Sequence, residues 1–142
     1  MNNYTNSLHI GASESNLDTV LDWVEHILEN NAVDNKTIGR IKVVSEEVFI
    51  NIAQYAYKEQ NISANEAVAD ITLDIHDNKL TLSFNDRGVP FNPLEKSDPD
   101  ISADIEDRPI GGLGIFITKK WMDTVQYERK DGKNVLTLEK IL

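Results

Sequence analysis

The sequence contains no cysteine, and this absence excludes two ways of stabilising a small domain. Neither a disulfide framework nor a thiolate metal site can form, and a cytosolic protein needs neither. Long apolar runs are also missing, since none approaches the ~18 residues of a membrane span. The opening residues MNNYTNSLHI lack the basic start and apolar centre of a signal peptide. We therefore expect a soluble, cytoplasmic protein with no membrane partner.

Basic residues are few relative to acidic ones. Lys and Arg number 14 against 24 Asp and Glu, which gives a formal net charge of −10. This charge opposes binding to nucleic acid, so we expect no nucleic acid among the partners. The 142 residues have the length of one domain with a single core, and we expect that domain to span 1–142.

Apolar residues recur at helical spacing in three stretches. Ser13 can cap the first helix, over about residues 17–28, and Asp34 can cap the second, which continues to about Tyr57. The third helix covers about residues 112–122. The pattern thus predicts two long amphipathic helices near the start of the chain and a shorter one near its end.

Strict alternation of apolar and polar residues predicts five strands. They lie at about 8–10, 71–75, 80–84, 125–129 and 134–141. Asp77-Asn78 and Asp131-Gly132 supply hairpin turns. The order β-α-α-β-β-loop-α-β-β shows no repeat and no linker. It predicts an α+β fold, a two-layer sandwich in which helices cover one face of a mostly antiparallel mixed sheet.

The second helix carries the segment SEEVFINIAQYAY, in which Glu47, Asn51 and Tyr55 follow each other at steps of four. Residues at this spacing project along one side of a helix. They can form a solvated face, as Glu46 does with Lys42 one turn before it. Alternatively, the amide oxygen of Asn51 binds Mg²⁺ beside a phosphate and the Glu47 carboxylate accepts a proton.

Two further segments have the same double interpretation. The first segment, FNDRGVPFNP, can be a plain turn. Alternatively, Asp86 at a strand end accepts a hydrogen bond from an amino group such as that of adenine, and Gly88 lets a flat base approach. GGLGIFI opens the third helix with Gly111, Gly112 and Gly114. These glycines permit close packing, or they leave backbone N–H groups free at a helix start to bind phosphate oxygens.

Taken together and in this order, the three segments resemble the N, G1 and G2 boxes of the GHKL superfamily of ATP-binding domains. The tail GGLGIFITKKWMDTVQYERKDGKNVLTLEK is most similar to the small anti-sigma factor serine kinases, the switch kinases of partner-switching pathways. The resemblance covers nearly the whole chain and implies the Bergerat fold. It also implies ATP, Mg²⁺, an anti-sigma factor antagonist bearing the target serine, a sigma factor and a homodimer.

The resemblance assigns roles by position. Asn51 would bind Mg²⁺, Glu47 would be the catalytic base for the partner's serine, and Asp86 would bind the adenine amino group. Gly88 would shape the adenine pocket, while Gly112 and Gly114 would let a lid and the third helix wrap the phosphates. At −10, the chain would need Mg²⁺ and backbone amides to neutralise a nucleotide.

The loop at residues 87–111 is longer than the ~12 to 15 residues usual for structureless connections. Its acidic stretch NPLEKSDPDISADIEDRPI is expected to form a mobile ATP lid at about 92–110 that orders with nucleotide or partner. Arg108 lies there, and we interpret it as a solvated cation. Lys119 and Lys120 are expected to be exposed.

Two positions depart from the family pattern. Pro90 stands where a second glycine is common and stiffens the start of the lid, and Tyr55 stands where relatives often carry histidine. Neither departure removes a group that phosphoryl transfer requires.

Two functions stay open from the sequence. The first is a Mg·ATP-dependent protein serine kinase, and the second is a nucleotide-gated binding module without phosphotransfer. A histidine sensor kinase core fits poorly, because the chain has no helical hairpin that presents a phosphoacceptor. His9, His26 and His76 are scattered and predict structural or surface roles.

Overall fold

The computed structural model describes residues 3–58, 62–63, 65–95 and 112–142, with residues 112–113 described by their backbone alone. The elements are β1 (Tyr4–Gly11), η1 (Glu14–Asn16), α1 (Leu17–Asn30), α2 (Asn35–Asn51), η2 (Ile52–Ala56), β2 (Val68–His76), β3 (Lys79–Asp86), η3 (Pro93–Glu95), α3 (Gly112–Trp121), β4 (Thr124–Lys130) and β5 (Lys133–Ile141). No described helix is long and apolar enough to cross a membrane.

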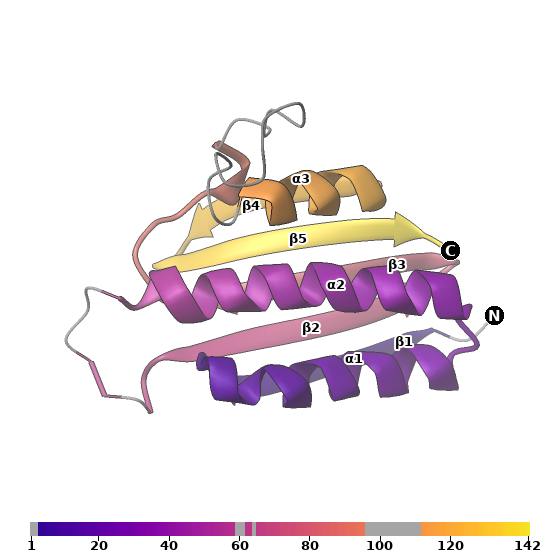
Figure 1. Ribbon diagram of the computed structural model, residues 1–142, viewed down its shortest axis with the longest axis horizontal. Coiled ribbons are helices and arrows are strands. Elements are labelled where there is room, and N and C mark those ends of the chain that lie inside the picture. Colours follow the sequence, from indigo (N-terminus) through magenta and orange to yellow (C-terminus); the bar gives the residue numbers. More distant parts are fainter. Residues whose placement is uncertain (1–2, 59–61, 64, 96–111) are drawn as a thin grey trace.

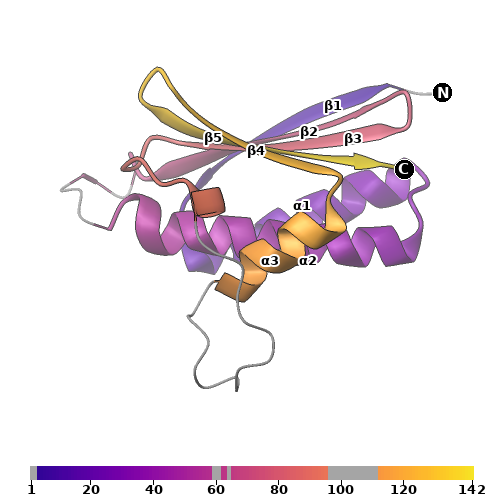
Figure 2. The same ribbon diagram turned by 90° about the horizontal axis from the view of Figure 1, so that it is seen from above.

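The five strands form one sheet in the order β1-β2-β3-β5-β4. Every pairing in it is antiparallel. Figures 1 and 2 show α1, α2 and α3 on the same face of this sheet, with α2 between the other two. The predicted α+β sandwich is therefore confirmed, and the described sheet is antiparallel throughout.

Both predicted hairpins are present, and their turns explain the register. Asp77 and Asn78 have φ of 51° and 64°, and Asp131 and Gly132 have φ of 52° and 76°. Two successive residues with positive φ make a type I′ turn, whose twist matches the strands on either side. The second turn pairs β4 with β5, and β5 in turn pairs with β3 so that Asn134 lies opposite Asp86.

The core lies between the sheet and the helices. Alternate residues of β2, β3 and β5 point inward and are buried, among them Ile71, Leu82 and Leu138. They pack against the apolar stripes of α1 and α2, which include Val24 and Phe49. Burial of these stripes, at about 25 cal/mol per Å² of apolar surface, is what fixes α2 across the middle of the sheet.

The helix starts agree with the predicted caps, and the end of α2 does not follow the expected α-helix. Asp34 accepts a hydrogen bond from Thr37 N at 3.1 Å, whereas Ser13 caps the short η1 turn that precedes α1. After Asn51 the helix widens into the π-helical η2. Such π segments are rare and occur often at functional sites.

Candidate functional site

A pocket of about 430 Å³ of open space, counting its mouth, lies where α2 passes over the ends of β3 and β5. Its wall is mostly apolar, with Val48 and Ile52 from the helical layer, Phe84 and Leu136 from the sheet, and Ile115 from α3. Few polar groups enter it, and they include Asn51, Asp86 and Asn134.

Asp86 is the buried carboxylate of the pocket, with 6% of its surface exposed. Its Oδ1 accepts hydrogen bonds from Gly88 N at 2.8 Å and from Asn134 Nδ2 at 2.9 Å. Among the residues that the structure describes, none donates to the other oxygen, Oδ2. Burial raises the pKa of Asp86, while the two hydrogen bonds and the charge of Arg129 oppose that rise. A buried acceptor without a donor suits a ligand that brings an amino group.

Gly88 follows Asp86 where the chain leaves the sheet. A Cβ at this position would overlap the backbone carbonyl of Ala56 in η2, so no larger residue fits. The contact is held by Val89 N, which donates to Ala56 O at 2.8 Å, and by Arg129 Nη1, which donates to Gly88 O at 2.8 Å. Gly88 thus lets the loop after β3 lie directly against the end of the α2 layer.

Asn134 is a site residue that the sequence analysis missed. It comes from β5, is 5% exposed, and lines the pocket beside Asp86. Tyr127 and Phe91 also line the pocket and bond to its side chain. The available signal was its place in the alternation Asn134-Leu136-Leu138, where a polar residue occupies an inward position.

Glu47 lies on the α3 side of α2. A Cβ at Gly114 would overlap the Glu47 carboxylate, so the two residues are in close contact across the helix interface. Burial, and to a lesser degree the charge of Glu46, raises the pKa of Glu47. A half-buried carboxylate with a raised pKa is a suitable general base, because its basicity approaches the working pH.

Asn51 is the last residue of α2 and lines the pocket one turn beyond Glu47. Of the six predicted positions, the structure places Asn51 and Asp86 in the pocket wall. Glu47 and Gly114 contact each other next to it, since the residues that follow them in the chain line the pocket, and Gly88 N donates to Asp86. Gly112 is the first residue of α3, as expected for a glycine that leaves helix-start N–H groups open.

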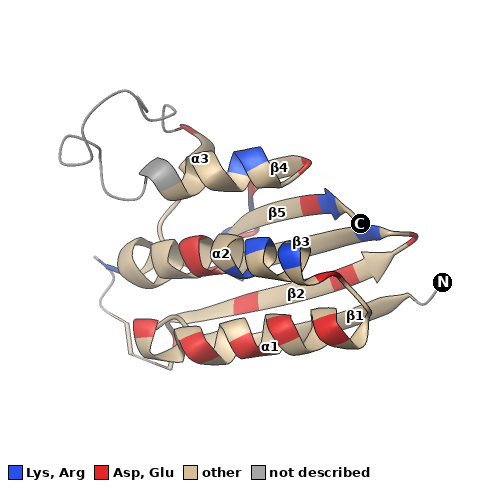
Figure 3. Cartoon of the chain, turned by 45° about the vertical axis from the view of Figure 1, so that its right-hand side comes forward, with Lys and Arg blue, Asp and Glu red and all other residues tan. Residues whose placement is uncertain are grey.

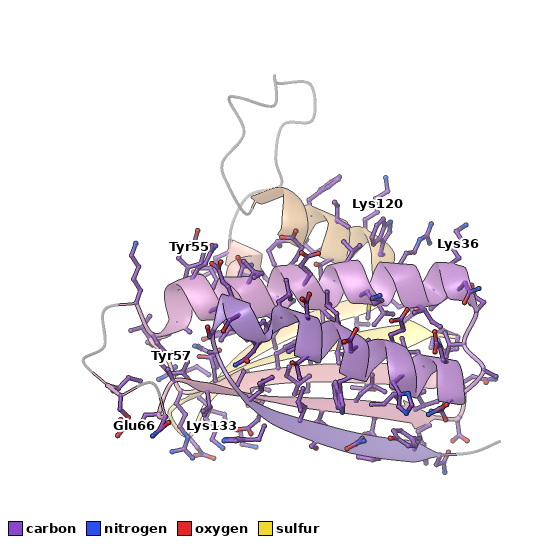
Figure 4. The ribbon with its side chains drawn as sticks, turned by 60° about the horizontal axis from the view of Figure 1, so that its bottom comes forward. Lys36, Tyr55, Tyr57, Glu66, Lys120 and Lys133 are labelled. Atoms are coloured by element: carbon purple, nitrogen blue, oxygen red, sulfur yellow. The ribbon has the colours of Figure 1, made fainter. Side chains whose placement is uncertain are left out.

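Tyr55 does not follow Glu47 and Asn51 along the helix into the pocket wall. Because α2 widens into η2 after Asn51, Tyr55 lies in the π segment and its ring stacks on Phe91 with centroids 6.1 Å apart. Figure 4 shows Tyr55 and Tyr57 at the same end of the α2 layer, far from Lys36 at its start. Tyr57 bridges two strands, since its hydroxyl donates to Val68 O and accepts from Arg87 N.

The remaining predicted residues fall at the surface or outside the described ranges. Lys119 and Lys120 are exposed on α3. Lys42 pairs with Glu25 of α1 at 3.3 Å and not with Glu46, because α1 packs along that side of α2. Arg108 and residues 96–110 of the expected lid lie outside the described residues.

The three histidines have local surface partners. His9 Nδ1 lies 2.5 Å from Asp70, His26 bonds to Asn30, and His76 lies 3.6 Å from its neighbour Asp77. Within residues 3–58, 62–63, 65–95 and 112–142, no three His, Asp or Glu side chains gather into a metal site. Figure 3 shows acidic residues along α1, both acidic and basic residues on α2, and basic residues on α3.

The sheet is antiparallel, the helices cover one face of it, and a pocket lies between an aspartate at a strand end and a helix that begins with glycine. These features define a class of nucleotide-binding α+β sandwich. The comparison of sequences agrees with this class. Residues 10–140 match the histidine kinase-like ATPase domain, and the chain belongs to that family.

Curated relatives carry kinase names. The chain is 24% identical to serine/threonine-protein kinase BtrW of Bordetella bronchiseptica over 97% of its length and 94% of that protein. It is 33% identical to serine-protein kinase RsbW of Bacillus thuringiensis over 103 residues, which are 70% of this chain and 61% of that protein.

Solved structures share the fold. The SiaB–SiaC complex of Pseudomonas aeruginosa matches with a TM-score of 0.63 at 13% identity, over 96% of this chain and 89% of that chain. The RsbU and RsbW domains of a Mycobacterium tuberculosis protein match with a TM-score of 0.65 at 14% identity, over 95% and 32% of the respective chains.

Proposed function

We propose that this protein is a Mg·ATP-dependent protein serine kinase that phosphorylates an anti-sigma factor antagonist and acts as an anti-sigma factor. The observation that carries the proposal is the contact between Glu47 and Gly114 at the edge of the pocket that holds Asp86. It combines a carboxylate of raised pKa, the start of a helix and a buried acceptor in one site. The names of BtrW and RsbW support the same reaction.

The residues present fit ATP and Mg²⁺ at two points. Asp86 Oδ2 is a buried acceptor that can take the adenine amino group, and the apolar walls from Val48, Ile52 and Leu136 suit a flat base. The amide oxygen of Asn51 is a hard ligand of the kind that Mg²⁺ prefers. When bound, Mg·ATP supplies the phosphoryl group, with its charge partly neutralised by the metal.

The chain's own groups would then perform the positioning and the proton transfer. The first N–H groups of α3, beginning at Gly112, have no partner within the helix and can donate to phosphate oxygens. Glu47 accepts the proton of an incoming serine hydroxyl, at the position where Gly114 leaves room for its carboxylate. The ionised form of Glu47 is required, so transfer should increase as the pH rises through its raised pKa.

The proposed partners are the antagonist, which bears the target serine, and a sigma factor, with the kinase as a homodimer. A structural neighbour is a complex, that of SiaB with SiaC, which supports a protein partner for this fold. A serine on a small folded antagonist, unlike a free hydroxyl compound, would bring its own surface to exclude water from the site.

The test incubates the protein with Mg·ATP and candidate antagonists encoded near its gene, and searches for phosphoserine by mass spectrometry. Glu47→Gln should keep nucleotide binding and reduce transfer by about 10² to 10⁴-fold, as expected for loss of a general base. The matched control is Glu46→Gln, an adjacent and exposed carboxylate, which should still transfer phosphate.

The outcomes separate the kinase from a nucleotide-gated binding module. Nucleotide binding with no phosphoserine on any candidate, in wild type as in Glu47→Gln, would indicate the binding module. Transfer that Glu47→Gln leaves unchanged would exclude Glu47 as the base. Nucleotide affinity should also fall sharply with a chelator, and equal affinity without metal would contradict the role of Asn51.

A further inference from the structure

The side chain of Asn134 uses all of its hydrogen-bonding groups at the pocket. Its Nδ2 donates to Asp86 Oδ1 at 2.9 Å and to Val89 O at 2.8 Å. Its Oδ1 accepts from Phe91 N at 3.2 Å and from the Tyr127 hydroxyl at 2.5 Å. One buried amide therefore joins the carboxylate, the loop that follows β3 and the edge strand β4.

These partners fix which end of the amide faces Asp86. Phe91 N can only donate, and the carbonyl of Val89 can only accept. If the amide were reversed, its oxygen would face both Val89 O and the Asp86 carboxylate, and its NH₂ would face Phe91 N. Two independent pairs thus require the observed orientation, and the Tyr127 hydroxyl reinforces it. Asn134 consequently presents a donor to Asp86 at all times.

A donor at this position determines what Asp86 offers to a ligand. Oδ1 is occupied by Gly88 N and Asn134 Nδ2, so a proton on Asp86 could reside only on Oδ2, the oxygen that the proposed function assigns to the ligand. An ionised Asp86 accepts from a 6-amino purine and repels a 6-oxo purine. A protonated Asp86 could donate to the 6-oxo group, and the discrimination would be lost.

We infer that Asn134 is a positioning residue that keeps Asp86 an anionic acceptor and so sets the preference for a 6-amino over a 6-oxo purine. The inference rests on the proposed function, since it takes the pocket to bind a purine nucleotide. The inference adds to the site a residue of β5, Asn134, which influences ligand binding through Asp86. Tyr127 supports the position of Asn134, because its hydroxyl donates a hydrogen bond to the amide oxygen.

The charges around Asp86 make Asn134 important for this balance. Burial raises the pKa of Asp86, and the donors that oppose it are Asn134, Gly88 N and, through its charge, Arg129 of β4. Tyr57, which follows η2, is the other ionisable group coupled to Asp86, and burial raises the pKa of its hydroxyl, so it stays neutral. Replacing Asn134 by leucine would remove one of these donors without adding a charge, so the pKa of Asp86 would rise further.

The experiment measures dissociation constants of Mg·ATP and Mg·ITP, which differ at the purine 6-position, by titration calorimetry. Asn134→Leu keeps a branched side chain but removes the donor to Asp86 Oδ1, so Asp86 binds a proton on Oδ2 more readily. We expect the ITP/ATP ratio of dissociation constants to fall about tenfold. In the variant the ratio should recover as the pH rises, because Asp86 loses that proton.

A milder variant and a matched control accompany it. Tyr127→Phe removes only the hydroxyl that holds the amide, and the ratio should fall by about threefold. Asn85→Leu makes the same substitution one residue from Asp86, on the opposite face of β3, and should leave the ratio unchanged. Thermal unfolding shows which variants are folded.

If a folded Asn134→Leu weakens the binding of both nucleotides equally, Asn134 has a structural role only and the inference is wrong. If Asn134→Leu does not fold, Tyr127→Phe decides, and an unchanged ratio there also contradicts the inference. Wild-type protein that binds neither nucleotide would overturn the proposed function as well, whereas binding with an unaltered ratio overturns this inference alone.

Discussion

Two carboxylates have pKa values raised by burial, and they are held in different ways: Asp86 lines the pocket, and Glu47 lies beside the pocket residue Val48. Asp86 is almost fully buried and fixed by donors from its own loop and from β5. Glu47 is half-buried, and no described residue donates to it. Its position comes from packing against Gly114 of α3.

This difference separates a half of the site that hydrogen bonds hold from a half that packing holds. On the Asp86 side, hydrogen bonds join β4, β5 and the loop that follows β3. On the Glu47 side, the carboxylate is in contact with Gly114 of α3. We therefore expect substitutions on the Asp86 side to change stability or base selection, and those on the Glu47 side to change transfer.

Gly88→Ala should have the largest effect. Its Cβ would overlap the Ala56 carbonyl, a backbone atom that cannot move without η2. Overpacking of this kind costs about 3 kcal/mol of unfolding free energy, and nucleotide binding should be lost with it. Denaturant unfolding measures the effect. The control is Gly39→Ala, where an added Cβ meets nothing and a gain of about 0.5 to 1 kcal/mol is expected.

Asp86→Asn should separate binding from stability. Its Oδ1 still accepts from Gly88 N and Asn134, but an NH₂ now faces the pocket, so ATP should bind about a hundredfold more weakly. Because the pKa of Asp86 is raised, its folded state holds a proton more tightly than the unfolded chain, and its ionisation lowers stability as pH rises. The variant should therefore unfold at the same or a higher temperature at neutral pH. A lower melting temperature would contradict this account.

Gly114→Ala tests the Glu47 side. The overlap here is with the far end of a flexible side chain, so Glu47 can move aside and the helix can tolerate alanine. We expect ATP affinity within a few-fold of wild type and a transfer rate reduced by about tenfold to a hundredfold, because the base is displaced. Single-turnover assays with saturating ATP measure it. Equal losses in affinity and rate would indicate that Gly114 serves nucleotide binding itself.

The sequence was sufficient to predict the helices and strands, and to propose the site residues that belong to short contiguous motifs. Alternation and turn residues predicted the five strands and both hairpins, since those signals depend on near neighbours. Glu47, Asp86 and Gly114 could be proposed as site residues because each belongs to a contiguous motif. Asn134 lies 48 residues from Asp86 and acquires its role only through the pairing of β3 with β5, which no local pattern specifies.

The π segment η2 was missed for a related reason. Its residues IAQYA have ordinary helical propensity, and the widening reflects contacts made elsewhere. Gln54 donates to Glu14 of η1, and the Ala56 carbonyl accepts from Val89 N. Within this segment the Tyr55 ring stacks on Phe91, so the expected alignment with Glu47 and Asn51 ends at Asn51.

Glu46→Gln has the smallest expected effect and tests the electrostatics of the Glu47 side. The charge of Glu46 is the second cause, after burial, of the raised pKa of Glu47. Removing it lowers that pKa, so the ionised base persists to lower pH and the acid limb of the transfer rate moves down in pH. On that limb the rate should increase about twofold, as expected for one exposed like-charge pair.

The same substitution distinguishes the two carboxylates. The effect on transfer should shrink as salt is added, because Glu46 is exposed and its field is screened over about 10 Å at 0.1 M salt. The ITP/ATP ratio should not change at all, since Asp86 is held by hydrogen bonds from β5 and its own loop. If Glu46→Gln leaves the pH dependence of the transfer rate unchanged, burial alone sets the basicity of Glu47. If it changes the ITP/ATP ratio, Glu47 and Asp86 influence each other.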